Sequence, residues 1–139
     1  MPEQEFKLHP RLAADTHWVC DWPASAVLLM NDTRFPWLVL VPRVPDAVEL
    51  FQLSARPQRA VFREIVVLGE AMQSLFGADK INTGALGNLV SQLHIHVIAR
   101  FSDDCAWPGP VWGVGQAQPY TEQGLAQRLD DLRAGLPRP

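Results

Sequence analysis

Two histidines, His94 and His96, lie two residues apart in the stretch 92–98, where polar and apolar residues alternate. Alternation is the period of a strand with one face in the core, so this pattern predicts a strand over 92–98. Both imidazoles and the Gln92 amide would share its polar face, while Leu93, Ile95 and Val97 would pack in the core. Residues two apart on one face lie about 7 Å apart, so both rings can address one small ligand.

Three interpretations of this histidine pair remain open on spacing alone. One imidazole could attack phosphorus while the other binds or protonates the phosphate. The pair could instead give two ligands to zinc, although the possible third ligands show no ligand spacing to it: His9, His17, Asp103, Asp104 and Cys105. A strand with solvent-facing histidines ranks third, because the chain has only four histidines and two of them lie here.

The loop before the histidines carries Gly84 and Gly87, and a second polar position follows an earlier apolar run. Two glycines three apart allow backbone amides to cradle an oxyanion, although such a pair also occurs in ordinary loops. Asn31 follows the apolar run 26–30. Asn often opens turns by hydrogen-bonding nearby backbone, and on the residues alone this role is favoured.

The segment His94–Ile98, preceded by Gly87–Val90, resembles the signature of the histidine-triad (HIT) superfamily of nucleotidyl hydrolases and transferases. That signature is His-φ-His-φ-His-φ-φ, with φ apolar, after a glycine-rich phosphate loop. In this frame Gln92 takes the place of the first histidine. The resemblance extends from about residue 28 to residue 100. The Gln-φ-His-φ-His form, with AWPGPVWG at 106–113, looks like a bacterial branch of small HIT-family hydrolases.

The resemblance implies a hydrolase or transferase that acts at the α-phosphorus of a nucleoside polyphosphate or phosphoramidate, with adenosine as the expected nucleoside. His94 would be the nucleophile and form a nucleotidyl-histidine intermediate, with His96 and Gln92 as the other catalytic residues. No cofactor and no metal are expected. The nucleotide would be bound at the ribose by Asn31, at the base by Leu29, and near the phosphates by the remaining residues: Asn82, Gly87, Asn88 and Leu89.

Three positions depart from the family pattern and concern the leaving group. Gln92 cannot titrate as a histidine does. Leu89 stands where many members have Ser or Thr, and Trp37 stands where another histidine is common. These departures favour good leaving groups such as acyl or polyphosphate adenylates. Two alternatives remain, a nucleotide-binding module with little catalysis and a zinc-dependent hydrolase that uses His94 and His96.

The elements that must position these residues indicate an α+β fold with about five antiparallel strands, one long helix across them and a C-terminal helix, and the resemblance implies that this fold is HIT-like. Further strands are expected at 18–22, 26–30, 37–41 and 80–83. A helix from Pro57 carries an apolar stripe and ends at Gly77; the stripe comprises Val61, Ile65, Leu68, Met72 and Leu75. Arg59, Arg63 and Glu64 would form its solvated face. Thr121 caps the C-terminal helix.

Composition limits the classes of partner and compartment. A chain of 139 residues with 47% hydrophobic residues predicts one domain over 1–139. A net charge of −3 without a basic run argues against nucleic-acid and membrane partners. Two cysteines, Cys20 and Cys105, are too few for a disulfide framework, and the acidic start 1–5 is unlike a signal peptide, so a cytoplasmic location is expected. The resemblance implies a homodimer.

Overall fold

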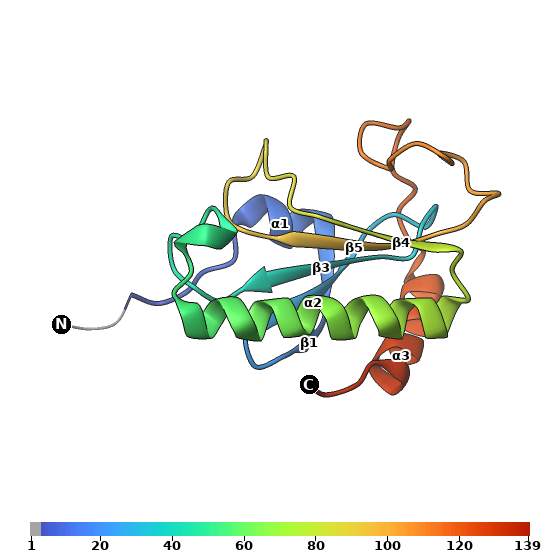
Figure 1. Ribbon diagram of the computed structural model, residues 1–139. Helices are drawn as coiled ribbons and strands as arrows, with labels where there is room; N and C mark the ends of the chain where they lie inside the picture. Colours follow the sequence, from blue (N-terminus) through green and yellow to red (C-terminus); the bar gives the residue numbers. More distant parts are fainter. Residues whose placement is uncertain (1–3) are drawn as a thin grey trace.

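Five antiparallel strands form one sheet in the order β1-β2-β3-β5-β4, and the long helix α2 lies across one of its faces (Figure 1). The computed structural model describes residues 4–139. In chain order the elements are α1 (Pro10–Asp15), β1 (Thr16–Asp21), β2 (Ser25–Met30), β3 (Trp37–Pro42), the 3₁₀ helix η1 (Leu50–Gln52), α2 (Ala55–Phe76), β4 (Lys80–Gly84), β5 (Ile95–Arg100) and α3 (Glu122–Gly135). The predicted α+β architecture is confirmed.

The register of β5 decides what surrounds the histidines. β5 lies between β3 and β4, with His96 opposite Val39 on one side and opposite Gly84 on the other. Trp37 lies opposite Ile98, which is two residues further along β5 than His96 and therefore on the same face. β3 therefore contributes the Trp37 and Val39 side chains to the face of His96, whereas β4 has a glycine beside it.

The sheet has an apolar core on each face. The helix-side core lies between the sheet and helices α2 and α3, and it includes Leu93, Ile95 and Val97 as the alternation predicts. The loop-side core lies on the opposite face, where Trp37, Val39 and Ile98 pack with buried residues of irregular segments, Phe35, Val90 and Val111. Because His96 alternates with Ile95 and Val97, it belongs to the loop-side face.

Helix boundaries follow local chemistry. Helix α2 begins two residues before Pro57, which lies in its first turn, and ends at Gly77. Gly77 has φ 65° and its N–H donates to the Gln73 carbonyl, an αL cap that suits glycine. The Thr121 hydroxyl accepts a hydrogen bond from the Gly124 N–H at 3.0 Å and caps α3, as predicted.

Two expectations about these elements are wrong. The strand predicted over 92–98 begins at Ile95, because the Leu93 N–H donates to the Ala47 carbonyl at 2.9 Å, outside the sheet. Glu64 does not lie on a solvated face: it is 2% exposed, and its carboxylate accepts a hydrogen bond from the Ala24 N–H at 2.8 Å. Glu64 thus faces the backbone of Ala24, the residue before β2.

Some expectations concern the chain as a whole. None of the described helices is long and apolar enough to cross a membrane. The single domain over 1–139 stays a prediction. Met1, Pro2 and Glu3, which entered the expectation about a signal peptide, lie outside the described residues.

Candidate active site

His94 lies immediately before β5 and has one ring nitrogen fixed by the backbone. Its Nδ1 is 2.7 Å from the Gln92 carbonyl oxygen. A carbonyl oxygen only accepts, so Nδ1 carries the proton of this bond. In the neutral ring Nε2 then keeps its lone pair, which is the form that a nucleophilic imidazole needs.

His96 has the opposite arrangement of donor and acceptor. The Trp37 indole N–H donates to His96 Nδ1 at 2.9 Å. An indole N–H cannot accept, so Nδ1 of His96 is the acceptor and the ring proton lies on Nε2. The centroids of the His94 and His96 rings are 4.9 Å apart with an interplanar angle of 71°. One ring therefore offers a lone pair beside a ring that offers an N–H.

Burial sets the charge state of His96. His94 is 6% exposed and His96 is 5% exposed. Burial, and secondarily the neighbouring His94, lower the pKa of His96 from 6.5 to about 4. At neutral pH His96 is therefore an uncharged hydrogen-bond donor, because a buried site disfavours the imidazolium.

Two tryptophans enclose the His96 ring. The Trp37 ring centroid lies 5.5 Å from that of His96, and the Trp112 ring lies edge-on at 5.3 Å. Trp112 also packs over Gly84, where an added Cβ would come within 3.2 Å of Trp112 Cη2. The indole of Trp112 thus comes from the segment after β5 and closes over the histidine face, where its buried N–H has no hydrogen-bond partner among residues 4–139.

Gln92 holds the N-terminal segment instead of an imidazole. Its side-chain oxygen accepts from the His9 N–H at 2.8 Å, and its side-chain nitrogen donates to the Lys7 carbonyl at 2.8 Å. The expectation that this amide faces the histidine pair is corrected by these contacts. The backbone of Gln92 orients His94, whereas its side chain orients residues 7–9.

Three of the expected nucleotide contacts, Leu29, Asn31 and Asn82, make other contacts within the protein. Leu29 is 1% exposed in the helix-side core, so it cannot line a pocket on the loop-side face. The Asn31 side-chain oxygen accepts from the Tyr120 N–H at 3.0 Å and tethers the segment before α3. Asn82 accepts from Arg100 Nη1 at 2.7 Å. The expectation that Leu29 lines the base pocket is therefore corrected. The side-chain oxygens of Asn31 and Asn82 are hydrogen-bonded within the protein.

The loop before β5 contains the other three expected contacts. Gly87 has φ 60°, a left-handed conformation that favours glycine. Asn88 is exposed, and Leu89 is 83% exposed. In the view of Figure 1 this loop projects on the side of the sheet away from α2. Its exposed tip is free to contact a ligand.

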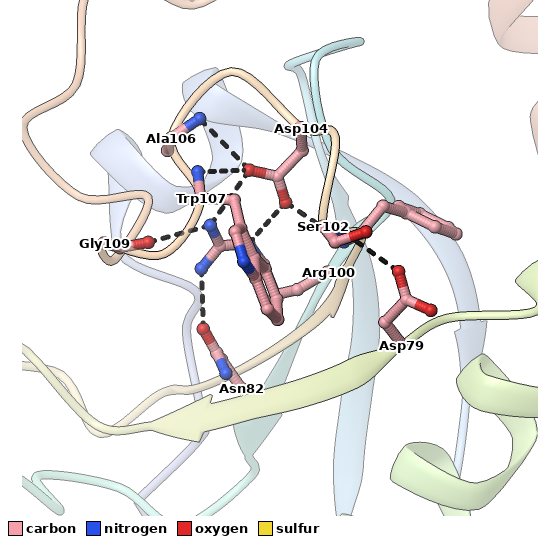
Figure 2. A network of polar contacts seen from close by, with 9 residues as sticks. Asp79, Asn82, Arg100, Ser102, Asp104, Ala106, Trp107 and Gly109 are labelled. Carbon is pink, nitrogen blue, oxygen red and sulfur yellow. Dashed lines mark hydrogen bonds and ion pairs between the residues drawn. The ribbon is translucent and has the colours of Figure 1, made fainter.

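A buried ion pair anchors the segment that carries Trp112, and sequence reasoning missed it. Figure 2 shows the Arg100 guanidinium between Asp104, Asn82 and the Gly109 carbonyl. Arg100 is 2% exposed and its Nε lies 2.8 Å from Asp104 Oδ2. Hydrogen bonds from Arg100 hold the pKa of Asp104 at about 2. The sequence did offer one signal for it: Arg100 lies four residues after His96, so in an alternating strand both side chains lie on the same face.

Phe35 lies between two such arginines. The Arg100 guanidinium is 5.6 Å from the Phe35 ring centroid, and that of Arg34 is 5.2 Å from it. Arg34 is paired with the buried Asp32 at 2.8 Å. Each of these two arginines therefore has its own carboxylate.

The surroundings bear on metal and ligand binding. Among residues 4–139, no group of three or more His, Cys, Asp or Glu side chains is arranged to hold a metal ion. A cavity of about 360 Å³ adjoins Gln92 and is otherwise lined by residues 4–7, Pro45 and Asp46. This cavity borders the N-terminal segment that Gln92 holds.

Comparison with known proteins gives one family and several similar structures. The HIT domain family matches residues 11–103. A histidine triad protein from Marinobacter aquaeolei is 47% identical, with a TM-score of 0.94 over 96% of this chain and 97% of that chain. A histidine triad protein from Bradyrhizobium japonicum is 43% identical, with a TM-score of 0.92 over 96% and 99%. One from Sinorhizobium meliloti is 41% identical, with a TM-score of 0.91 over 94% and 97%. No curated protein matches the chain.

Proposed function

The chain belongs to the HIT domain family, and from this premise we propose that it is a nucleotidyl hydrolase or transferase. Its substrate class is a nucleoside polyphosphate or phosphoramidate, with adenosine as the expected nucleoside. The observation that carries the proposal is the His94 Nδ1 contact of 2.7 Å with the Gln92 carbonyl, which leaves Nε2 as the free nucleophile.

The proposed chemistry uses the two rings in different roles. His94 Nε2 attacks the α-phosphorus and forms a nucleotidyl-histidine, which water or another acceptor then cleaves. His96 Nε2–H donates to a non-bridging oxygen as negative charge develops there. Backbone amides around Gly87, Asn88 and Leu89 are proposed to add to this stabilisation. Neither step needs a cofactor.

The decisive experiment looks for the covalent intermediate. Incubation with an adenylate labelled at the α-phosphorus should place acid-labile label on His94, detected by mass spectrometry of the quenched protein. His94→Ala should abolish both label and turnover while nucleotide binding stays measurable by calorimetry. His17→Ala is the matched control, because His17 lies on the edge strand β1. Turnover retained in His94→Ala would refute the assignment.

A second candidate function is nucleotide binding with little catalysis. It is favoured by the burial of both rings, which are 6% and 5% exposed. The two candidates differ in one result, because a binding module would retain nucleotide affinity and give no labelled His94. The zinc hydrolase alternative lacks a third ligand among the described residues. Metal analysis of the purified protein and the effect of chelators on turnover test it directly.

A homodimer and a cytoplasmic location are part of the same proposal. An exposed apolar row on η1 and α2 supports a self-association surface: Phe51 is 80%, Phe62 68% and Val66 41% exposed. Phe62→Glu should convert the dimer to a monomer in light scattering, whereas a dimer of unchanged mass would place the interface elsewhere. Free thiols at Cys20 and Cys105 agree with a reducing compartment.

A further inference from the structure

We propose that Trp37 is a positioning residue that holds His96 as a neutral Nε2–H donor, so that the site favours leaving groups that depart without a proton. This inference rests on the proposed function. It concerns a position where the resemblance to the family leads one to expect histidine. A histidine could exchange a proton with His96, whereas an indole cannot.

The direction of one hydrogen bond carries the inference. Trp37 Nε1 is 2.9 Å from His96 Nδ1, and both side chains are buried, at 7% and 5% exposure. Protonation of His96 at Nδ1 would place two N–H groups against each other. The bond would be lost, and the indole N–H would be left buried without a partner, which costs about 1–3 kcal/mol. The pair therefore resists formation of the imidazolium.

The groups that face His96 from neighbouring elements reinforce this effect. β3 contributes Trp37, β4 contributes Gly84, and the segment after β5 contributes Trp112. His94 is the titratable side chain in ring contact. Arg100 lies four residues along β5, about 13 Å by strand rise, and is paired with Asp104. None of these contacts is a carboxylate that would favour the imidazolium. Burial, and secondarily His94, therefore lower the pKa of His96 without opposition.

The consequence for the leaving group follows from the electron balance. His94 Nε2 forms the N–P bond with its lone pair while the bond from phosphorus to the leaving atom breaks. A phosphate leaving oxygen takes that electron pair as a stable anion. A leaving nitrogen would become an amide anion unless it gained a proton, which neutral His96 does not supply. In the second step water forms the O–P bond, His94 recovers its electron pair, and one proton passes to solvent.

The tautomers are testable in the wild-type protein. Labelling with ¹⁵N-histidine gives four ring systems, and two-bond ¹H–¹⁵N correlations distinguish their protonated nitrogens. We expect the Nδ1–H form for His94 and the Nε2–H form for His96 at pH 7, assigned with His94→Asn and His96→Asn. A His96 ring with a proton on Nδ1 at this pH would overturn the proposal without any mutation at Trp37.

The substrate preference is tested with an adenosine polyphosphate and an adenosine phosphoramidate. In the wild type the ratio of kcat/KM should favour the polyphosphate. Trp37→His, which places a titratable ring against His96 Nδ1, should shift the ratio at pH 6 toward the phosphoramidate by at least tenfold, since a general acid contributes about 10²–10⁴-fold. Trp37→Phe, which removes the indole N–H but keeps His96 buried, should shift the ratio in the same direction by a smaller factor. Trp18→Phe is the control, because Trp18 also donates its indole N–H, to Asp21, but is 54% exposed on β1.

The outcomes separate this inference from the proposed function. Turnover of the polyphosphate with an unchanged ratio in both folded Trp37 variants would overturn the positioning role alone. Turnover of neither substrate by the wild type would overturn the proposed function and the preference with it, while the ¹⁵N spectra still decide the tautomer of His96. If the variants fail to fold, judged by circular dichroism, the wild-type spectra carry the test.

Discussion

Replacement of Asp104 by Asn tests the ion pair that anchors the segment after β5. Asp104 accepts from Arg100 Nε at 2.8 Å and Nη2 at 3.0 Å. It also accepts from backbone N–H groups, those of Phe101, Ala106 and Trp107. Asp104→Asn keeps the size and one oxygen acceptor but removes the charge. Arg100, 2% exposed, is then left as a buried cation without its counterion.

The size of the effect follows from the protonation equilibrium of Asp104. Its pKa falls from 3.8 to about 2 in the folded protein, which corresponds to about 2.5 kcal/mol of stability at neutral pH. For a chain of 139 residues, this loss lowers Tm by about 8 °C. The folded pKa is depressed, so the contribution is complete above pH 3.8 and disappears as the pH falls toward 2. The difference between wild type and Asp104→Asn should therefore shrink over that range.

The assay is urea denaturation at pH 7 and pH 2.5, with thermal scans at pH 7. Asp15→Asn is the matched control, because Arg11 and Asp15 form another i,i+4 pair, at 3.5 Å, but are 59% and 53% exposed. Such an exposed pair contributes about 0–0.5 kcal/mol. If Asp104→Asn lost no more stability at pH 7 than Asp15→Asn, the ion pair would not anchor the segment.

Three further predictions concern His96, Gln92 and Gly84. Between pH 6.5 and 4 the free energy of unfolding of the wild type, measured by urea denaturation, should fall by about 3 kcal/mol. The unfolded His96 ring takes up a proton in this range, whereas the folded ring, with its pKa lowered to about 4, does not. His96→Asn should remove this loss. Gln92→Ala should speed amide hydrogen exchange at His9, by loss of the Gln92 acceptor, without loss of the fold; unchanged exchange would contradict this role. Gly84→Ala should displace Trp112, since its Cβ would lie 3.2 Å from the indole, and so change tryptophan fluorescence and lower kcat; an unchanged spectrum would show that Trp112 accommodates the methyl group.

Periodicity predicted most of the fold. The stripe at spacings of three and four located α2, and Gly77 and Thr121 located helix ends, because these signals are local. The predicted start of β5 was wrong because residues 92–94 continue the alternation but do not pair in the sheet. The Leu93 N–H instead donates to the carbonyl of Ala47, 46 residues earlier in the chain. Strand pairing depends on such distant partners, which alternation does not specify.

The histidine pair was predictable, but its surroundings were not. His94 and His96 share a side because alternation fixes parity. Leu29 was misplaced because β2 is apolar at nearly every position, so parity does not reveal which face meets α2. The Gln92, Asn31 and Asn82 amides all bond to segments far along the chain, and such partners exist only once the chain has folded.

The paired arginines around Phe35 have a consequence for how anions associate with this face. Arg34 and Arg100 are matched by Asp32 and Asp104, so they add little net positive charge. In the proposed function, a polyphosphate bound near the neutral His96 ring and backbone amides would displace few condensed counterions. Its affinity should therefore vary little between low and high ionic strength, unlike that of sites built from free lysines and arginines.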